Sequence, residues 1–82
     1  MTNQQRVKQF IVENFYVSDP AELGPDASLI TGGYVDSTGM LEVITFLEGE
    51  FGIRVQDQEM VPENLETIGR IASFVTRKKA AA

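Results

Sequence analysis

The chain contains no cysteine, no histidine and no tryptophan. Without cysteine there is no disulfide, no thiol nucleophile and no thiolate ligand for a metal ion. Without histidine the chain lacks the usual general base near neutral pH, so a Ser-His-Asp triad cannot be assembled from it. No acidic run has the ligand spacing of an EF-hand calcium loop either. We therefore expect neither a metal site nor an enzyme, and any chemistry needs a reactive group from another molecule.

Long hydrophobic runs are also absent. No apolar stretch approaches the 18 or more residues that a membrane span requires, and residues 1–5 are polar, unlike the start of a signal peptide. We expect a cytoplasmic protein with no membrane span.

The length of 82 residues fits one small domain, and 43% hydrophobic with 23% charged residues is typical of a globular chain. A chain this short has room for a thin core but little room for a deep substrate cleft. We expect a single domain over residues 1–82, monomeric, with a disordered tail at 79–82.

Positive charge is scarce in the middle of the chain. The net charge is −5, and residues 36–66 hold eight acidic side chains against one arginine, whereas residues 67–82 hold four basic side chains and no acidic one. An acidic surface repels nucleic-acid phosphates and is suited to basic patches on partner proteins. The alternative, that the acidic side chains only keep a small domain soluble, stays open.

The hydrophobic pattern predicts an all-α fold. Apolar residues recur at helical spacing over 3–16, over 37–51 and from between 64 and 67 to about 78. Thr2 and Gln5 have the spacing of a capping box, and Gly52 stands where a left-handed helix end is expected. A single helical turn is predicted at 57–60, ended before Pro62. The expected fold is a small four-helix bundle, with three main helices and one short helix.

A long loop connects the first two helices in this prediction. Residues 17–35 contain three helix-breaking segments, at 18–20, 24–26 and 32–33, and one short turn capped by Asp19 is expected within them. Five apolar side chains are expected to pin the loop to the core and keep it ordered. They are Leu23, Leu29, Ile30, Tyr34 and Val35.

The junction at residues 33–39 is the candidate functional site. A glycine-rich loop brings Asp36 and Ser37 to the start of an amphipathic helix, where free backbone N–H groups and the helix dipole favour a phosphate ester. Ser37 would be exposed to a large enzyme, and Asp36 would contact that enzyme or a metal ion that it holds. Asp and Ser are also the commonest helix caps, so this pair alone does not distinguish a cap from a modified site.

The whole run around this junction resembles the second helix of acyl carrier proteins, in which an Asp-Ser motif opens the helix and a Leu-Glu-x-Glu-Phe-Gly-Ile-like run closes it. The order of helices and the long first loop match that family over nearly the whole chain. The residues that carry the resemblance are Val35-Asp36-Ser37 and Leu41-Glu42-Val43-Ile44-Thr45-Phe46-Leu47-Glu48-Gly49-Glu50-Phe51-Gly52-Ile53.

The resemblance implies a discrete, non-catalytic carrier. Ser37 would receive 4′-phosphopantetheine from coenzyme A through a separate Mg-dependent phosphopantetheinyl transferase. The thiol of this arm would hold an acyl or aminoacyl group as a thioester, loaded by an adenylating enzyme and passed to acyltransfer or synthase enzymes. The implied partner-docking residues are Asp36, Thr38, Met40, Glu42, Glu48 and Glu50. By periodicity alone, Met40, Ile44 and Phe51 face the core, although carriers can bury acyl chains among such residues.

Two residues depart from the family pattern. Leu usually follows the serine and helps partner enzymes grip the carrier, but here Thr38 and Gly39 follow it. Gly39 also weakens a helix by up to about 1 kcal/mol relative to Ala. These residues favour a specialised or peptidyl-carrier-like member over the fatty-acid carrier. The alternative from another class is an unmodified acidic adaptor that binds a partner through its second helix.

Overall fold

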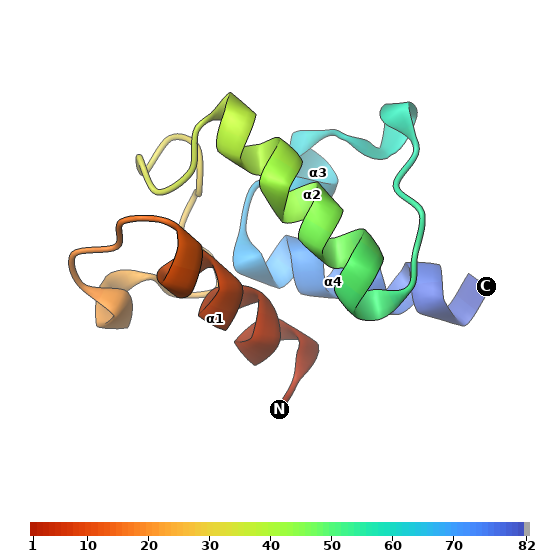
Figure 1. The fold of residues 1–82 in the computed structure, drawn as a ribbon, viewed down its shortest axis with the longest axis horizontal. Helices are drawn as coiled ribbons and strands as arrows, with labels where there is room; N and C mark the ends of the chain where they lie inside the picture. The colour runs from red at the N-terminus through yellow and green to blue at the C-terminus, as the bar shows by residue number, and fades with distance from the viewer. Residues whose placement is uncertain (82) are drawn as a thin grey trace.

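The computed structural model describes residues 1–81, which form helices and 3₁₀ turns and no strand. The elements follow one another from the N-terminus as red to blue in Figure 1. They are α1 (Asn3–Asn14), η1 (Pro20–Glu22), α2 (Ser37–Phe51), η2 (Asp57–Glu59), α3 (Pro62–Leu65) and α4 (Ile68–Ala81). The expected fold of three main helices and one short one is confirmed.

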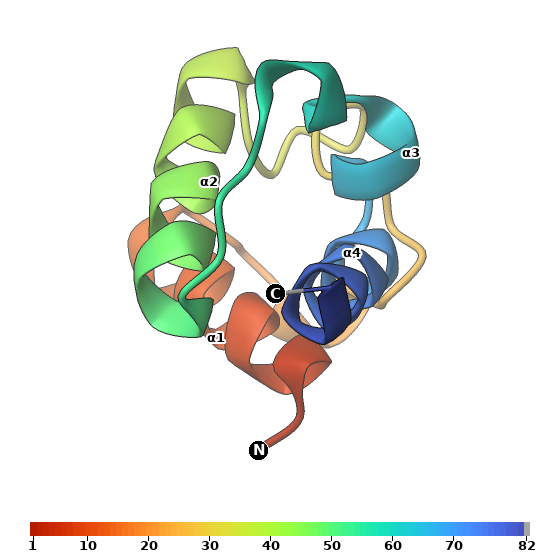
Figure 2. The same cartoon turned by 90° about the vertical axis from the view of Figure 1, so that its right-hand side faces the viewer.

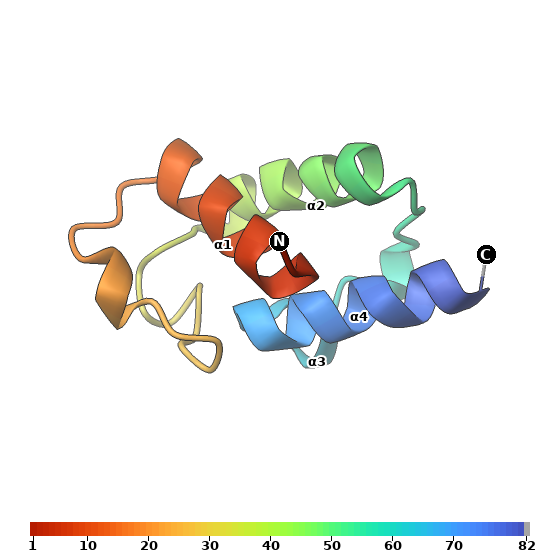
Figure 3. The ribbon, with the colours of Figure 1, turned by 90° about the horizontal axis from the view of Figure 1, so that it is seen from below.

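The three main helices surround one core. Helices α1 and α3 both pack on α4, and α2 crosses α4 in Figure 1 and lies to one side of it in Figure 2. Seen from below in Figure 3, α1 lies nearest the viewer and runs obliquely from the level of α2 to that of α4. Each helix contributes buried apolar residues to this core. The fully buried side chains are Val7, Ile11, Leu23, Leu29, Val43, Leu47, Ile68, Ile71 and Val75.

Local signals set the ends of α1 and α2. The Thr2 hydroxyl accepts a hydrogen bond from the Gln5 N–H at 3.1 Å, and the Gln5 side chain accepts one from the Thr2 N–H at 2.8 Å, which confirms the capping box. Gly52 ends α2 with φ +67°, in the left-handed conformation that glycine adopts without strain. The predicted bounds of α2 are confirmed.

Helix α1 ends two residues before its predicted end. Phe15 is already extended, with φ −128° and ψ 155°, and Tyr16 is 88% exposed. The Asn14 side chain donates to the Phe10 carbonyl at 2.9 Å, a contact within the last turn of the helix. The Phe15 ring instead packs partly buried against the core.

The short α-helix is not the predicted one. Residues Asp57–Glu59 form only a 3₁₀ turn, and the short helix α3 begins at Pro62, which the sequence pattern had indicated only as a stop. Proline is favourable at a first helical position because its φ is preset and its missing N–H is not needed there. Thr67 then caps α4, accepting from the Arg70 N–H at 3.1 Å.

The expected disordered tail at 79–82 is wrong for residues 79–81, because α4 continues through Ala81. Alanine has the highest helix propensity, and the Lys79 ammonium lies 5.9 Å from the centre of the Phe51 ring. Residue 82 lies outside the described residues.

The long loop at 17–35 is tied to the far end of the chain. The Leu29 N–H donates to the Glu66 carbonyl and the Gly69 N–H donates to the Pro25 carbonyl, both at 2.9 Å. Leu23, Leu29 and Val35 are buried as expected, but Ile30 is 45% exposed. Half-buried Tyr34 packs against the core, so four of the five expected anchors hold the loop.

Candidate functional site

The start of α2 presents Ser37 on a capped helix end. Asp36 is the N-cap, and its carboxylate accepts the Gly39 N–H at 2.6 Å while its carbonyl accepts the Met40 N–H at 2.9 Å. Ser37 is the first helical residue and is exposed. Because the capping role belongs to Asp36, the Ser37 hydroxyl is available to another molecule. The amides of Ser37 and Thr38 are among the first of the helix, which have no intrahelical partner and favour an anion.

The loop before the site holds Asp36 and Ser37 in place. The amides of Tyr34 and Val35 both donate to the Leu29 carbonyl, at 2.9 and 3.0 Å. The Val35 side chain is 2% exposed, so the residue next to Asp36 is anchored in the core. The chain turns into this arrangement at Gly33, whose φ of +79° favours glycine. Ser37 therefore projects from an ordered base.

The six residues predicted to dock partners do not share one environment. Asp36, Thr38 and Glu42 are exposed around Ser37, and Met40 is half-buried. Glu48 accepts the Val55 N–H at 3.0 Å and Glu50 pairs with Arg6 at 3.2 Å. Both of these glutamates thus serve contacts within the chain. Their docking role remains a prediction, and Glu42 is the glutamate that extends the exposed surface around Ser37.

Two exposed apolar residues near the site were not expected from sequence. Leu41 belongs to the apolar pattern that predicts a helix over 37–51, yet it is 58% exposed. Its position four residues after Ser37 puts both on one helix face, which is the sequence signal that could have found it. Tyr16 was placed in the first helix, and the end of α1 at Asn14 leaves it exposed instead.

An apolar cavity of about 310 Å³ lies between the loop, the start of α2 and α3. Met40 lines it from α2, and Ile30 and Met60 stand at its exposed side with 45% and 38% exposure. Of the three residues assigned to the core by periodicity, Ile44 is buried, whereas Met40 and Phe51 are half-buried and pack against the core. The other lining residues are Thr31, Val61, Pro62, Leu65 and Glu66.

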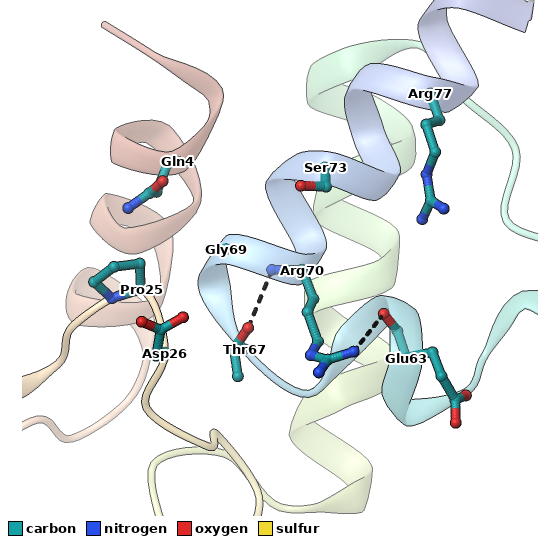
Figure 4. A pocket seen from close by; sticks show the side chains of 9 residues that line it. All are labelled: Gln4, Pro25, Asp26, Glu63, Thr67, Gly69, Arg70, Ser73 and Arg77. Atoms are coloured by element: carbon teal, nitrogen blue, oxygen red, sulfur yellow. Dashed lines mark hydrogen bonds between the residues drawn. The ribbon is translucent and has the colours of Figure 1, made fainter.

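A second, polar hollow of about 650 Å³ lies on α4 and is shown in Figure 4. Its arginines are engaged within the chain: Arg70 donates to the Glu63 carbonyl at 3.4 Å, and Arg77 donates to the Asn64 side chain at 3.0 Å. These contacts fasten α3 to α4. The hollow was not expected from sequence.

Within residues 1–81, no three His, Cys, Asp or Glu side chains are grouped as metal ligands would be. None of the described helices is long and apolar enough to pass through a membrane.

Known proteins resemble this chain along almost its entire length. It is 32% identical over 79 residues to an acyl carrier protein of Solidesulfovibrio magneticus, which covers 96% of this chain and 97% of that protein. It is 34% identical over 77 residues to an acyl carrier protein of Thermosynechococcus vestitus, which covers 94% of this chain and 91% of that protein. No family model matches the chain.

Proposed function

The chain belongs to the acyl carrier protein family, and we propose that it is a discrete carrier with 4′-phosphopantetheine attached to Ser37. The observation that carries this proposal is the exposed Ser37 hydroxyl on an ordered helix start, beside a cap that Asp36 already supplies. The residues fit the group, because the first amides of α2 favour its phosphate and the serine hydroxyl is the atom to which it would be linked. When bound, the group supplies a thiol that holds the cargo as a thioester.

The protein's own residues then present and shelter that cargo rather than react with it. The apolar cavity lined by Met40 and Ile30 supports an apolar acyl group, because burial there removes hydrocarbon from water. Its opening beside Ile30 and Met60, which are partly exposed, supports reversible entry. The carrier itself catalyses no step.

The partners proposed are a phosphopantetheinyl transferase, an acyl- or aminoacyl-loading adenylating enzyme and the acyltransfer or synthase enzymes that follow. Exposed Asp36, Thr38 and Glu42 would meet the basic side chains of these enzymes, and Leu41 adds apolar area to the same surface. The polar Thr38 supports a specialised biosynthetic pathway or a branch of lipid metabolism. We propose that these encounters take place in the cytoplasm.

The test is the intact mass of the purified protein after incubation with coenzyme A, Mg²⁺ and a broad-specificity phosphopantetheinyl transferase. The parent is expected to gain one phosphopantetheine and Ser37→Ala none. Ser18→Ala is the matched control, since Ser18 is also an exposed serine next to an aspartate and should leave the gain intact.

A folded parent that gains no mass with several transferases would contradict the proposal and favour the unmodified adaptor. A gain that persists in Ser37→Ala would place the modification on another residue.

A further inference from the structure

Gly39 occupies a space that no side chain fits. It lies two residues after Ser37 in the first turn of α2 and is buried. A Cβ atom at this position would lie 2.6 Å from Phe15 Cε1 and 3.1 Å from both the Asp36 carboxylate and Val35 Cγ1. Its φ is not positive, so the backbone conformation does not require glycine. Glycine is required at position 39 because Phe15 and the Asp36 cap lie too close to leave room for a Cβ atom.

Phe15 is held in place by contacts with α1. Its N–H donates to the Ile11 carbonyl at 3.0 Å, and its ring meets the Phe10 ring edge-on with 6.2 Å between ring centres. Phe10 in turn stacks on Phe46 of α2 at 4.1 Å. The Phe15 ring therefore contacts Phe10 of α1, which stacks on Phe46 of α2, and displacing the ring disturbs close packing among these side chains.

We propose that Gly39 and Phe15 form a positioning pair that sets where the first turn of α2, and with it Ser37, stands relative to α1. This inference rests on the proposed function, because Ser37 is taken as the residue presented to a transferase. A side chain at 39 must displace the ring or tilt the turn, and it also presses on the Asp36 oxygen that receives the Gly39 N–H. Gly39, although unfavourable for helix formation, thereby fixes the position of Ser37.

A double-mutant cycle tests the pair, with kcat/KM for phosphopantetheine transfer measured at a temperature where circular dichroism shows every variant folded. Gly39→Ala is expected to lower kcat/KM by at least about tenfold, because small misplacements of a reacting group are costly. Phe15→Ala removes the obstructing ring, so Gly39→Ala/Phe15→Ala is expected to return to within about threefold of Phe15→Ala alone. Phe15→Leu is the milder partner if Phe15→Ala does not fold.

Gly49→Ala is the matched control, because Gly49 lies in the same helix and a Cβ there meets nothing within 4 Å. It should transfer at the parental rate. Parental transfer by Gly39→Ala would overturn the proposal. A loss of kcat/KM in Gly39→Ala that Phe15→Ala does not recover would also overturn the proposal. So would a loss that the unfolded fraction of Gly39→Ala accounts for.

A second measurement keeps this inference separate from the proposed function. In amide NMR spectra without any enzyme, Gly39→Ala should shift the signals of residues 36–40, and the double variant should return them toward those of Phe15→Ala. If the parent accepts no phosphopantetheine but these shifts and their reversal appear, the proposed function fails and the positioning pair stands. Spectra in which residues 36–40 do not move overturn the pair.

Discussion

At the scale of single residues, Asp36 and Ser37 have different roles, which the sequence alone did not assign to one residue or the other. Asp36 caps α2 through its carboxylate, whereas Ser37 has an exposed side chain in the first turn. An aspartate cap contributes to stability because it satisfies an otherwise unpaired amide at the helix start. Modification of the Ser37 hydroxyl therefore leaves the cap of α2 intact.

Asp36→Ala is accordingly expected to lower the free energy of unfolding by about 0.5–2 kcal/mol, measured by urea denaturation. Ser37→Ala should stay within about 0.5 kcal/mol of the parent, as for exposed residues outside a cap. Asp36→Asn is the control, since asparagine caps about as well as aspartate. An equal loss in the free energy of unfolding in Asp36→Ala and Ser37→Ala would contradict the assignment of the capping role to Asp36 alone.

At the scale of elements, Glu59 joins η2 to α4. Its carboxylate accepts the Gln56 N–H at 2.9 Å and the Lys78 ammonium at 2.9 Å. Hydrogen bonding from the Gln56 amide, followed by that from Lys78, lowers the pKa of Glu59 below its ordinary value. Because the folded pKa is the lower one, the stabilisation is present above the unfolded pKa and is lost as the pH falls through the folded pKa.

Lys78→Met should raise the pKa of Glu59 toward its ordinary value, though not fully, because the Gln56 amide remains. Carboxyl NMR titration measures this, and the pH-dependent part of stability should shrink in the variant. Lys79→Met is the control, since the neighbouring Lys79 lies over the Phe51 ring. An unchanged Glu59 titration in Lys78→Met would contradict the ion pair.

Elements with local signals could be predicted from the sequence, and those that depend on distant contacts could not. The capping box at Thr2, the cap at Asp36 and the glycine stop at Gly52 lie within a few residues of the helix ends that they define. The start of α3 was missed because a proline is compatible with both a helix stop and a first helical position.

The candidate site divides in the same way. The exposure of Ser37 follows from its place at a helix start, which the sequence pattern located. The internal partners of Glu48 and Glu50 do not follow from it, because Val55 and Arg6 reach them only after the chain folds back. The need for glycine at 39 could not be predicted for the same reason, since Phe15 follows the end of α1 and meets Gly39 only in the folded chain.

At the scale of the whole molecule, the separation of charge along the chain remains in the structure. The acidic Glu42, Glu48 and Glu50 lie on α2, whereas the basic Lys78 and Lys79 lie in the last turn of α4. Internal pairing with Arg6 and Lys78 partly neutralises Glu50 and Glu59. Around α2, the negative charge that an approaching protein meets without an internal ion pair or core contact is therefore that of the exposed Asp36 and Glu42.

Glu42→Lys is expected to lower kcat/KM for transfer by a basic transferase by about tenfold at low salt, with most of the loss removed at about 1 M salt. Glu22→Lys makes the same change in net charge at an exposed residue of η1 and should have a smaller effect. Comparable losses in both variants would indicate a response to net charge rather than to a docking surface.

The hydrogen bonds that tie the long loop to the junction of α3 and α4 also order events in time. Leu29 and Pro25 have their partners at Glu66 and Gly69, which a ribosome adds well after the loop itself. A nascent chain that stops before residue 66 lacks both bonds, so its loop has not yet closed around the base of α2. We therefore expect an enzyme that recognises the folded loop to leave such a chain unmodified and to act only once residues 66–69 have joined the fold.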